Sequence, residues 1–208
     1  HEKKISKHTK FIVPVHWEGN AGELIKIMKI AKKYKLKIIE DASHAPGNSY
    51  HNKKIGNFGI ASVFSFNQPK TLMTGEGGMV CTNNSIIAKK SRLIRNHGEA
   101  IISLKDTKNM MQNSVGYNYR LTEIQAAIGC EQIRFMDKLN NIRKKNYDFL
   151  TSNIIRKFSH ILEPQKILNN EHYSYISIFL YKGKNISRKK FILEINKLGI
   201  PFGPGISR

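Results

Sequence analysis

The chain has 208 residues, of which 40% are hydrophobic, so it is long enough to bury a core and is not generally disordered. Lys and Arg total 35 against 15 Asp and Glu, a formal net charge of +20 that would suit an anionic partner. Because the lysines are spread along the chain without an aromatic-interleaved basic stripe, a basic regulatory or nucleic-acid-binding protein is kept only as a second interpretation.

The two cysteines argue against a structural metal or a disulfide framework. Cys81 and Cys130 are far apart in the sequence and follow no metal-ligand spacing. This usage of cysteine fits a reducing compartment. No apolar run approaches the about 18 residues that a bilayer span requires. We therefore expect a cytoplasmic protein with no metal and no membrane partner.

The first part of the chain alternates between strands and helices. Residues 11–15 form a short apolar run that predicts a strand, residues 22–34 have apolar side chains at helical spacing, and residues 36–41 predict a second strand. Strand, helix and strand within about 30 residues make a βαβ unit, so we expect a parallel sheet with functional groups at the carboxyl ends of its strands. Asp41 lies at such an end.

The α/β pattern continues. Residues 61–66 and 77–82 predict two further strands on either side of a glycine-containing loop. Residues 85–98 predict a helix that begins at Asn84 or Ser85 and ends at Gly98.

A polar, irregular stretch at 99–114 precedes a long predicted helix. Thr122 and Gln125 stand at capping-box spacing at its start. The apolar residues that follow at amphipathic spacing are Ile124, Ile128, Phe135, Leu139 and Ile142. We expect this helix to bridge two regions.

Beyond about residue 155 the pattern changes. Residues 172–181 alternate like a half-buried strand, and residues 187–199 predict a helix capped by Ser187. We therefore divide the chain into residues 1–155, part of a larger domain that includes the start of the interdomain helix, and residues 156–208, part of a smaller α+β domain.

Lys70 stands out within residues 64–78, FSFNQPKTLMTGEGG. The residues before it contain no glycine, so it is not the lysine of a P-loop. In a chain so rich in lysine it could be an ordinary surface residue. Between a buried strand and a glycine loop, however, an amine can be partly desolvated and free to attack a carbonyl group.

Neighbouring residue types fit such chemistry with pyridoxal phosphate. Asp41 can hold the pyridine nitrogen protonated, and Ser65 offers a hydroxyl to the phosphate. His44 follows Asp41 by three residues and is within reach of the same pocket. The glycines 75, 77 and 78 allow close approach of the backbone.

The stretches IIEDASHAPG, GNFGIASVFSFNQPKTLMTGEGGMVCTN, RLIRNHG and GYNYRLTEIQAAIG occur in this order. Together they resemble the DegT/DnrJ/EryC1/StrS family of pyridoxal-phosphate-dependent nucleotide-sugar aminotransferases. The resemblance runs from about residue 11 to about residue 199. It implies the type I, aspartate aminotransferase-like fold, with a mostly parallel sheet flanked by helices.

The resemblance also implies roles for single residues. Lys70 would form the Schiff base with the cofactor and shuttle a proton to the substrate carbon, while Asp41 would pair with the pyridinium nitrogen. His44 would lie near the ring hydroxyl, and Ser65 would bind the phosphate. Asn118 would reach the phosphate of a neighbouring subunit, which implies a homodimer with shared active sites.

The implied reaction is transfer of an amino group, with glutamate as donor, to a keto-sugar on a nucleotide, for synthesis of cell-surface polysaccharide. Whether the nucleotide is GDP or UDP stays open. The family is longer at both ends, so we expect an internal fragment or a truncated product. A catalytically inactive remnant of the family is therefore also kept as an alternative. The triplet NQP before Lys70 departs from the usual family pattern.

Overall fold

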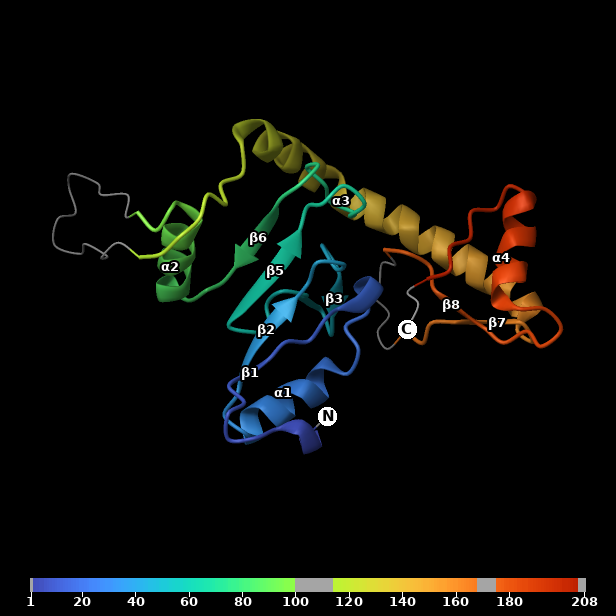
Figure 1. Cartoon of the computed structure of the whole chain (residues 1–208), viewed down its shortest axis with the longest axis horizontal. Coiled ribbons are helices and arrows are strands. Elements are labelled where there is room, and N and C mark those ends of the chain that lie inside the picture. The colour runs from blue at the N-terminus through green and yellow to red at the C-terminus, as the bar shows by residue number, and fades with distance from the viewer. Residues whose placement is uncertain (1, 100–113, 168–174, 206–208) are drawn as a thin grey trace.

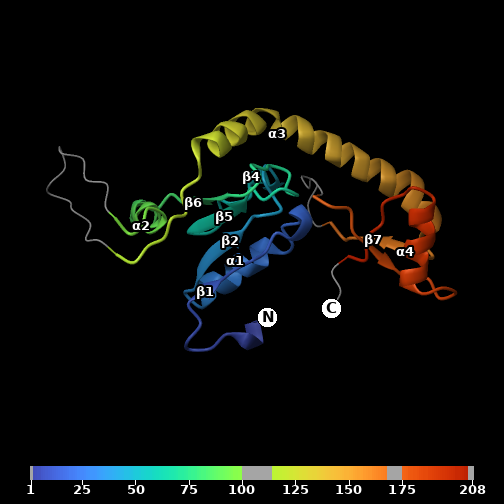
Figure 2. The same ribbon diagram turned by 45° about the horizontal axis from the view of Figure 1, so that its top comes forward.

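A computed structural model describes residues 2–99, 114–167 and 175–205. Within these ranges a sheet and its helices form one part of the molecule. The long helix α3 (Glu123–Phe149) passes over this sheet and reaches a small hairpin and helix at its other end (Figures 1 and 2). The predicted irregular stretch at 99–114 lies almost wholly outside the described residues.

The main sheet of the described residues has the strand order β1-β2-β5-β6. Its strands are β1 (Phe11–Ile12), β2 (Lys37–Asp41), β5 (Ala61–Ser65) and β6 (Gly78–Cys81). The β1–β2 and β2–β5 pairings are parallel, and β5–β6 is antiparallel. The α/β class with a mostly parallel sheet is therefore confirmed. The last strand reverses because its loop folds back on itself.

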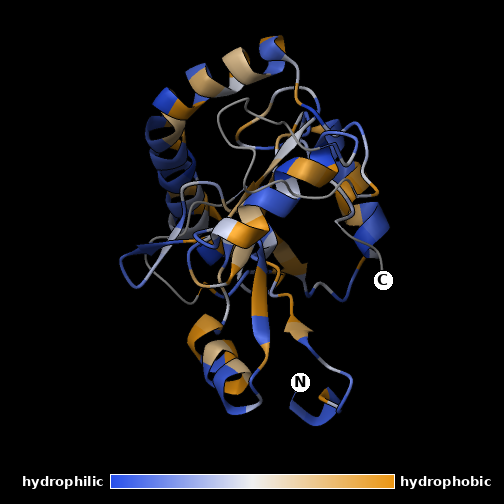
Figure 3. Cartoon of the chain, turned by 90° about the vertical axis from the view of Figure 1, so that its left-hand side faces the viewer, coloured by the Kyte–Doolittle hydropathy of each residue, from blue (hydrophilic) through white to orange (hydrophobic). Residues whose placement is uncertain are grey.

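Three of the predicted helix starts are confirmed by their caps. Asn84 accepts hydrogen bonds from two backbone N–H groups at the start of α2 (Ser85–Arg95). Thr122 and Gln125 form the capping box of α3, and Ser187 caps α4 (Arg188–Lys197). The first helix, α1 (Leu24–Lys33), carries separate apolar and lysine-rich stripes (Figure 3).

Two small hairpins complete the strands. The first, β3 (Ser49–Tyr50) with β4 (Lys53–Lys54), was not predicted, because its turn places two non-glycine residues, His51 and Asn52, at φ of 49° and 60°. Such turns usually contain glycine.

The second hairpin pairs β7 (Leu162–Pro164) with β8 (Phe179–Tyr181). The predicted strand 172–181 was too long, and its residues 172–174 lie outside the described part. Residues 175 and 176 direct their backbone N–H groups to Glu18 and so leave the ladder.

The core of the sheet part is small. Leu24 of α1 is completely buried and packs with short side chains that follow β2 and with the first hairpin. The members of this cluster are Ala21, Leu24, Ala42, Ala45, Tyr50 and Ile55, with Phe58 and Phe64 packed against it.

The predicted apolar stripe of α3 is not buried in this chain. Its residues Ile124, Ile128, Phe135, Leu139 and Ile142 are all exposed. Beyond α3 the chain continues as a π-helical turn, η4 (Leu150–Ile154), and a 3-10 turn, η5 (Ile155–Phe158). Two other 3-10 turns are η1 (Glu2–Lys4) and η2 (Trp17–Gly19). The predicted helix is confirmed, but its apolar side is open to solvent.

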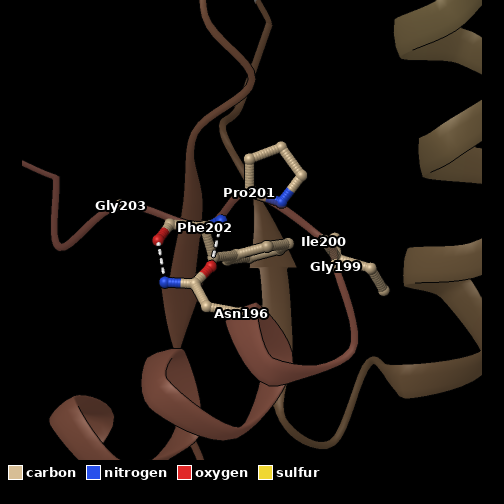
Figure 4. A pocket seen from close by; sticks show the side chains of 6 residues that line it. All are labelled: Asn196, Gly199, Ile200, Pro201, Phe202 and Gly203. Atoms are coloured by element: carbon tan, nitrogen blue, oxygen red, sulfur yellow. Dashed lines mark hydrogen bonds between the residues drawn. The ribbon is translucent and has the colours of Figure 1, made fainter.

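A surface pocket lies after α4, where Asn196 brackets Phe202 by donating to its carbonyl (3.0 Å) and accepting from its N–H (2.7 Å). It is lined by Asn196, Gly199, Ile200, Pro201, Phe202 and Gly203 (Figure 4). None of the predicted site residues lines it. In the part of the chain that the structure describes, no helix has both the length and the apolar character needed to span a bilayer.

Candidate active site

Lys70 lies in the loop between β5 and β6. Its backbone N–H donates to the carbonyl of Asn67 (2.9 Å), and the two ends of the loop meet where the Phe66 N–H donates to the Gly77 carbonyl (2.9 Å). Glycine suits position 77, since its φ of 141° is one that residues with a side chain rarely adopt. The Lys70 side chain is half-buried.

Helix α3 holds this loop through two glutamine side chains. The Gln132 Oε1 accepts from the Met73 N–H (2.9 Å), and the Gln125 Nε2 donates to the Glu76 carbonyl (3.0 Å). These bonds tie both sides of the loop to one rigid helix. The placement of Lys70 therefore depends on α3 as well as on the sheet.

Asp41 lies at the carboxyl end of β2, where β2 runs parallel to β5. Its backbone N–H donates to the Pro14 carbonyl (2.9 Å), and its carbonyl accepts from the His16 N–H (3.0 Å). Its Oδ1 accepts from both the N–H (3.1 Å) and the hydroxyl of Ser43. The carboxylate is thus fixed at the sheet edge that leads toward the Lys70 loop.

His44 lies between two aromatic rings. Its ring centroid is 5.1 Å from that of Trp17 and 4.8 Å from that of Tyr175. Its Nδ1 accepts the backbone N–H of Glu18 (3.3 Å), so a neutral His44 carries its proton on Nε2. Burial lowers the pKa of His44, the charge of Lys70 lowers it further, and the charge of Asp41 opposes both.

Lys70, Asp41 and His44 therefore lie in one neighbourhood. The charges of Lys70 and Asp41 both act on the imidazole of His44. The Nζ of Lys70 lies over the ring of Tyr175, 5.2 Å from its centroid. An amine, a carboxylate and a neutral imidazole thus converge beside aromatic rings, at the carboxyl ends of two parallel strands.

The other two predicted residues are placed differently. Ser65 ends β5 on the same sheet edge, and its Oγ accepts the Asn67 N–H (3.4 Å). Asn118 is exposed in the segment between α2 and α3, where it forms a β-bridge with Asn96. The structure therefore leaves Asn118 outside the cluster around Lys70.

Three residues of this cluster were missed by sequence reasoning. Trp17 and Glu18 follow β1, and the rule that groups collect at the carboxyl ends of parallel strands could have pointed to them. Tyr175 could not have been found in this way, because it comes from a distant part of the chain. Among the described residues, no group of three or more His, Cys, Asp or Glu side chains is suited to a metal ion.

Comparison with known proteins decides what kind of chain this is. The family model described as the DegT/DnrJ/EryC1/StrS aminotransferase family matches residues 1–204. The chain belongs to this family. Pyridoxal phosphate is the cofactor of the family, whose solved structures share the α/β fold described above.

Two relatives show how much of a family member the chain represents. A UDP-4-amino-4,6-dideoxy-N-acetyl-beta-L-altrosamine transaminase of Helicobacter pylori is 38% identical over 201 residues, which cover 96% of this chain and 52% of the relative. A GDP-perosamine synthase of Caulobacter vibrioides is 33% identical over 204 residues, 98% of this chain and 54% of the relative. The chain spans about half the length of these family members.

Solved structures of the family agree. The Helicobacter pylori aminotransferase involved in the biosynthesis of pseudoaminic acid has a TM-score of 0.79 at 36% identity and is matched over 95% of this chain and 53% of its own. An Escherichia coli GDP-4-keto-6-deoxy-D-mannose-3-dehydratase with bound hydrated pyridoxal phosphate has a TM-score of 0.81 at 25% identity, over 96% of this chain and 54% of its own. The same backbone thus occurs in family members named for two different reactions.

Proposed function

We propose that the protein containing this chain is a pyridoxal-phosphate-dependent aminotransferase that acts on a nucleotide-linked keto-sugar, with glutamate as the amino donor. One observation carries the proposal. In a chain of this family, the Lys70 amine and the His44 ring lie against the same Tyr175 ring, at 5.2 Å and 4.8 Å, and Asp41 ends β2, which runs parallel to β5. The carboxyl ends of parallel strands are where an α/β sheet binds its ligand.

The residues of the cluster fit the chemistry of the cofactor. Lys70 offers the amine that a cofactor aldehyde requires, and Asp41 offers a carboxylate for a protonated ring nitrogen. Because Glu18 donates to the Nδ1 of His44, the Nε2–H of His44 is free to donate to the ring hydroxyl. Ser65 offers its hydroxyl to the phosphate. When bound, the cofactor supplies an electron sink for the substrate carbon.

The chain's own groups then hold and move the proton. With the cofactor bound, the Lys70 Nζ would accept the proton of the substrate carbon as a general base and would then donate it as a general acid. Burial and the charge of Lys70 lower the pKa of His44, which favours its neutral form. The rings of Trp17 and Tyr175 flank His44 and limit its orientations.

The type of reaction follows from the residue at position 70. The family contains both aminotransferases and a dehydratase. A lysine provides the amine that proton transfer in transamination needs, and the family resemblance implies that some relatives with histidine there carry out dehydration instead. Lys70 therefore favours amino transfer for this protein. The product would serve the synthesis of cell-surface polysaccharide, including lipopolysaccharide.

We propose a homodimer in which Asn118 completes the phosphate site of the partner. Two observations support this. Asn118 is exposed and lies apart from the Lys70 cluster of its own chain, and the apolar residues along α3 are exposed as well. Exposed apolar surface of this extent is typical of protein interfaces.

The division into residues 1–155 and 156–208 is likewise proposed. It is supported by the end of the long helical segment, where η4 gives way to η5, and by the separate β7–β8 hairpin beyond it. A cytoplasmic location is supported by the free cysteines Cys81 and Cys130.

An amino-transfer assay tests the proposal. The complete protein is given pyridoxal phosphate, glutamate and a GDP- or UDP-linked 4-keto-6-deoxy sugar, and the aminated product is quantified. Lys70→Ala should lower kcat by about 10²–10⁴-fold, the range for a lost general acid–base group. Lys53→Ala, a change at an exposed lysine, should leave it unaltered. Full activity of Lys70→Ala would refute the proposal.

A further inference from the structure

Glu18 is an unusual residue for its position. The residue is only 4% exposed, and its backbone has φ 52° and ψ 31°, in the left-handed region that non-glycine residues seldom occupy. An acidic side chain is seldom buried to this degree without partners. The partners of Glu18 should therefore explain why it is there.

Those partners lie in a distant part of the chain. The Oε2 of Glu18 accepts the backbone N–H of Ile176 (3.0 Å), and the carbonyl of Glu18 accepts the N–H of Tyr175 (3.5 Å). Hydrogen bonds to a charged acceptor are the stronger ones. Glu18, in the turn η2 after β1, thus binds the backbone segment that leads into β8.

The segment that Glu18 binds contains Tyr175, whose aromatic ring lies next to the Lys70 amine. The Tyr175 ring centroid is 5.2 Å from the Nζ of Lys70 and 4.8 Å from the His44 ring. An ammonium group within about 6 Å of a ring face is attracted to it. The ring therefore both covers the amine and limits its orientations.

The electrostatics of Glu18 agree with this geometry. Burial raises the pKa of Glu18, while the hydrogen bond from Ile176 and the charge of Lys70 oppose that rise without cancelling it. The carboxyl also lies near the imidazole, with 3.6 Å between its Oε1 and the Nδ1 of His44. Glu18 is thus in contact with the groups that surround Lys70.

We propose that Glu18 is a positioning residue of the Lys70 site: its carboxylate binds the backbone N–H of Ile176, next to Tyr175, and so helps to keep the Tyr175 ring over the Lys70 amine. This proposal rests on the proposed function only in taking pyridoxal phosphate as the carbonyl compound that reacts with Lys70. Whether the Tyr175 ring covers the Lys70 amine can be tested on the protein without the cofactor.

Two substitutions at position 18 separate the hydrogen bond from the charge. Glu18→Gln keeps an oxygen that can accept the Ile176 N–H, whereas Glu18→Gly removes it. Both lose the negative charge. Glycine suits the left-handed backbone, so the Gly variant should keep its fold and its N–H bond to His44. At position 175, Tyr175→Phe keeps the ring and Tyr175→Ala removes it.

The measurement is the rate at which the cofactor-free protein is acetylated at Lys70 by an N-hydroxysuccinimide ester, followed by peptide mass spectrometry. Lys53 is the internal control in every sample, because its Nζ also lies over a ring, that of Phe58, at 4.9 Å. Circular dichroism of each variant checks that its fold is kept.

We expect Lys70 to be acetylated about two- to five-fold faster in Glu18→Gly than in Glu18→Gln, as befits the loss of a cation–π contact. Tyr175→Ala should exceed Tyr175→Phe by a similar factor. Equal Lys70 rates in the two position-18 variants, or a parallel rise at Lys53, would overturn the proposal. Because acetylation needs no cofactor, sugar or amino donor, the result is independent of the amino-transfer assay.

Discussion

Two buried glutamates in different regions of the molecule have opposite environments. Glu40, inside β2, is completely buried, and its oxygens accept the backbone N–H groups of Gly56 (2.9 Å), Phe58 (2.6 Å) and Gly59 (2.8 Å). The Nε2 of the buried His16 lies 3.0 Å from the same carboxylate. Four polar protein groups thus surround this carboxylate.

Glu18, beyond the end of β1, has far fewer donors. Burial would raise the pKa of Glu40, but its hydrogen bonds outweigh burial and hold the pKa below 4.5. For Glu18 burial prevails, and the pKa lies above 4.5. The number of hydrogen-bond donors thus decides the direction of the pKa shift. Hydrogen bonds lower the pKa of Glu40, whereas burial raises that of Glu18, which lies near the Lys70 amine.

The largest effect on stability should come from removing the carboxylate of Glu40, which has more hydrogen-bond donors than that of Glu18. Glu40→Ala leaves three N–H groups and His16 without their acceptor, and we expect a loss of about 3–5 kcal/mol in the free energy of unfolding. Urea unfolding measures it as a lower midpoint with an unchanged slope. Glu163→Ala, which removes an exposed ion pair with Lys182, should stay within about 0.5 kcal/mol of the parent. A Glu40→Ala protein as stable as this control would contradict the comparison.

The two glutamates should also give opposite pH dependence. The folded pKa of Glu40 is lowered, so its contribution to stability is present above 4.5 and is lost as the pH falls through the folded value. The folded pKa of Glu18 is raised, so its contribution is present below 4.5 and is lost as the pH rises through the folded value.

Urea midpoints measured from below to above pH 4.5 would show this opposite pH dependence. The deficit of Glu40→Gln relative to the parent should grow as the pH rises, whereas Glu18→Gln should become more stable relative to the parent over the same interval. Deficits that change with pH in the same direction would show that the two sites do not differ as described.

His44 reports the charges beside it. Burial lowers its pKa, Lys70 lowers it further and Asp41 opposes this. Lys70→Met should therefore raise the pKa of His44, and Asp41→Asn should lower it. NMR titration of the imidazole C–H signals measures both, with the exposed His160 as a reference signal in the same spectra. If neither substitution moves the titration of His44, the three groups do not share one site.

The smallest effect is expected for an exposed carboxylate. Asp148 pairs with Lys144 one helical turn away on α3 (2.6 Å), and both side chains are substantially exposed. Asp148→Asn should cost only about 0.3–0.5 kcal/mol, the usual value for such helix pairs. Urea unfolding at low and high salt should show this difference shrink with salt. A loss as large as that of Glu40→Ala would remove burial as the basis of the comparison.

Several features were predictable because local sequence determines them. The caps at Asn84, Thr122 and Ser187 form as expected, since each side chain bonds within its own first helical turn. Asp41 and Lys70 could be brought together because parallel strands end at the same sheet edge. The strand alternation therefore predicted the sheet edge at which the candidate site is proposed to lie.

Other features depend on long-range contacts that no local pattern encodes. The Tyr175 ring lies near the Lys70 amine, and the neighbouring amide of Ile176 donates to Glu18, whereas the apolar spacing of 172–181 predicted a longer strand. The amphipathic spacing of α3 predicted its helix but not that its apolar side is exposed. The roles of Ser65 and Asn118 toward a phosphate remain predictions.

The most direct test of the central claim is to locate the cofactor on the protein. The complete protein is incubated with pyridoxal phosphate, reduced with borohydride and digested, and the modified lysine is identified by mass spectrometry. The account predicts a modification concentrated at Lys70, absent after Lys70→Ala and retained after Lys53→Ala. Modification spread over the exposed lysines, with Lys70 not preferred, would contradict the assignment of Lys70 as the cofactor-binding residue.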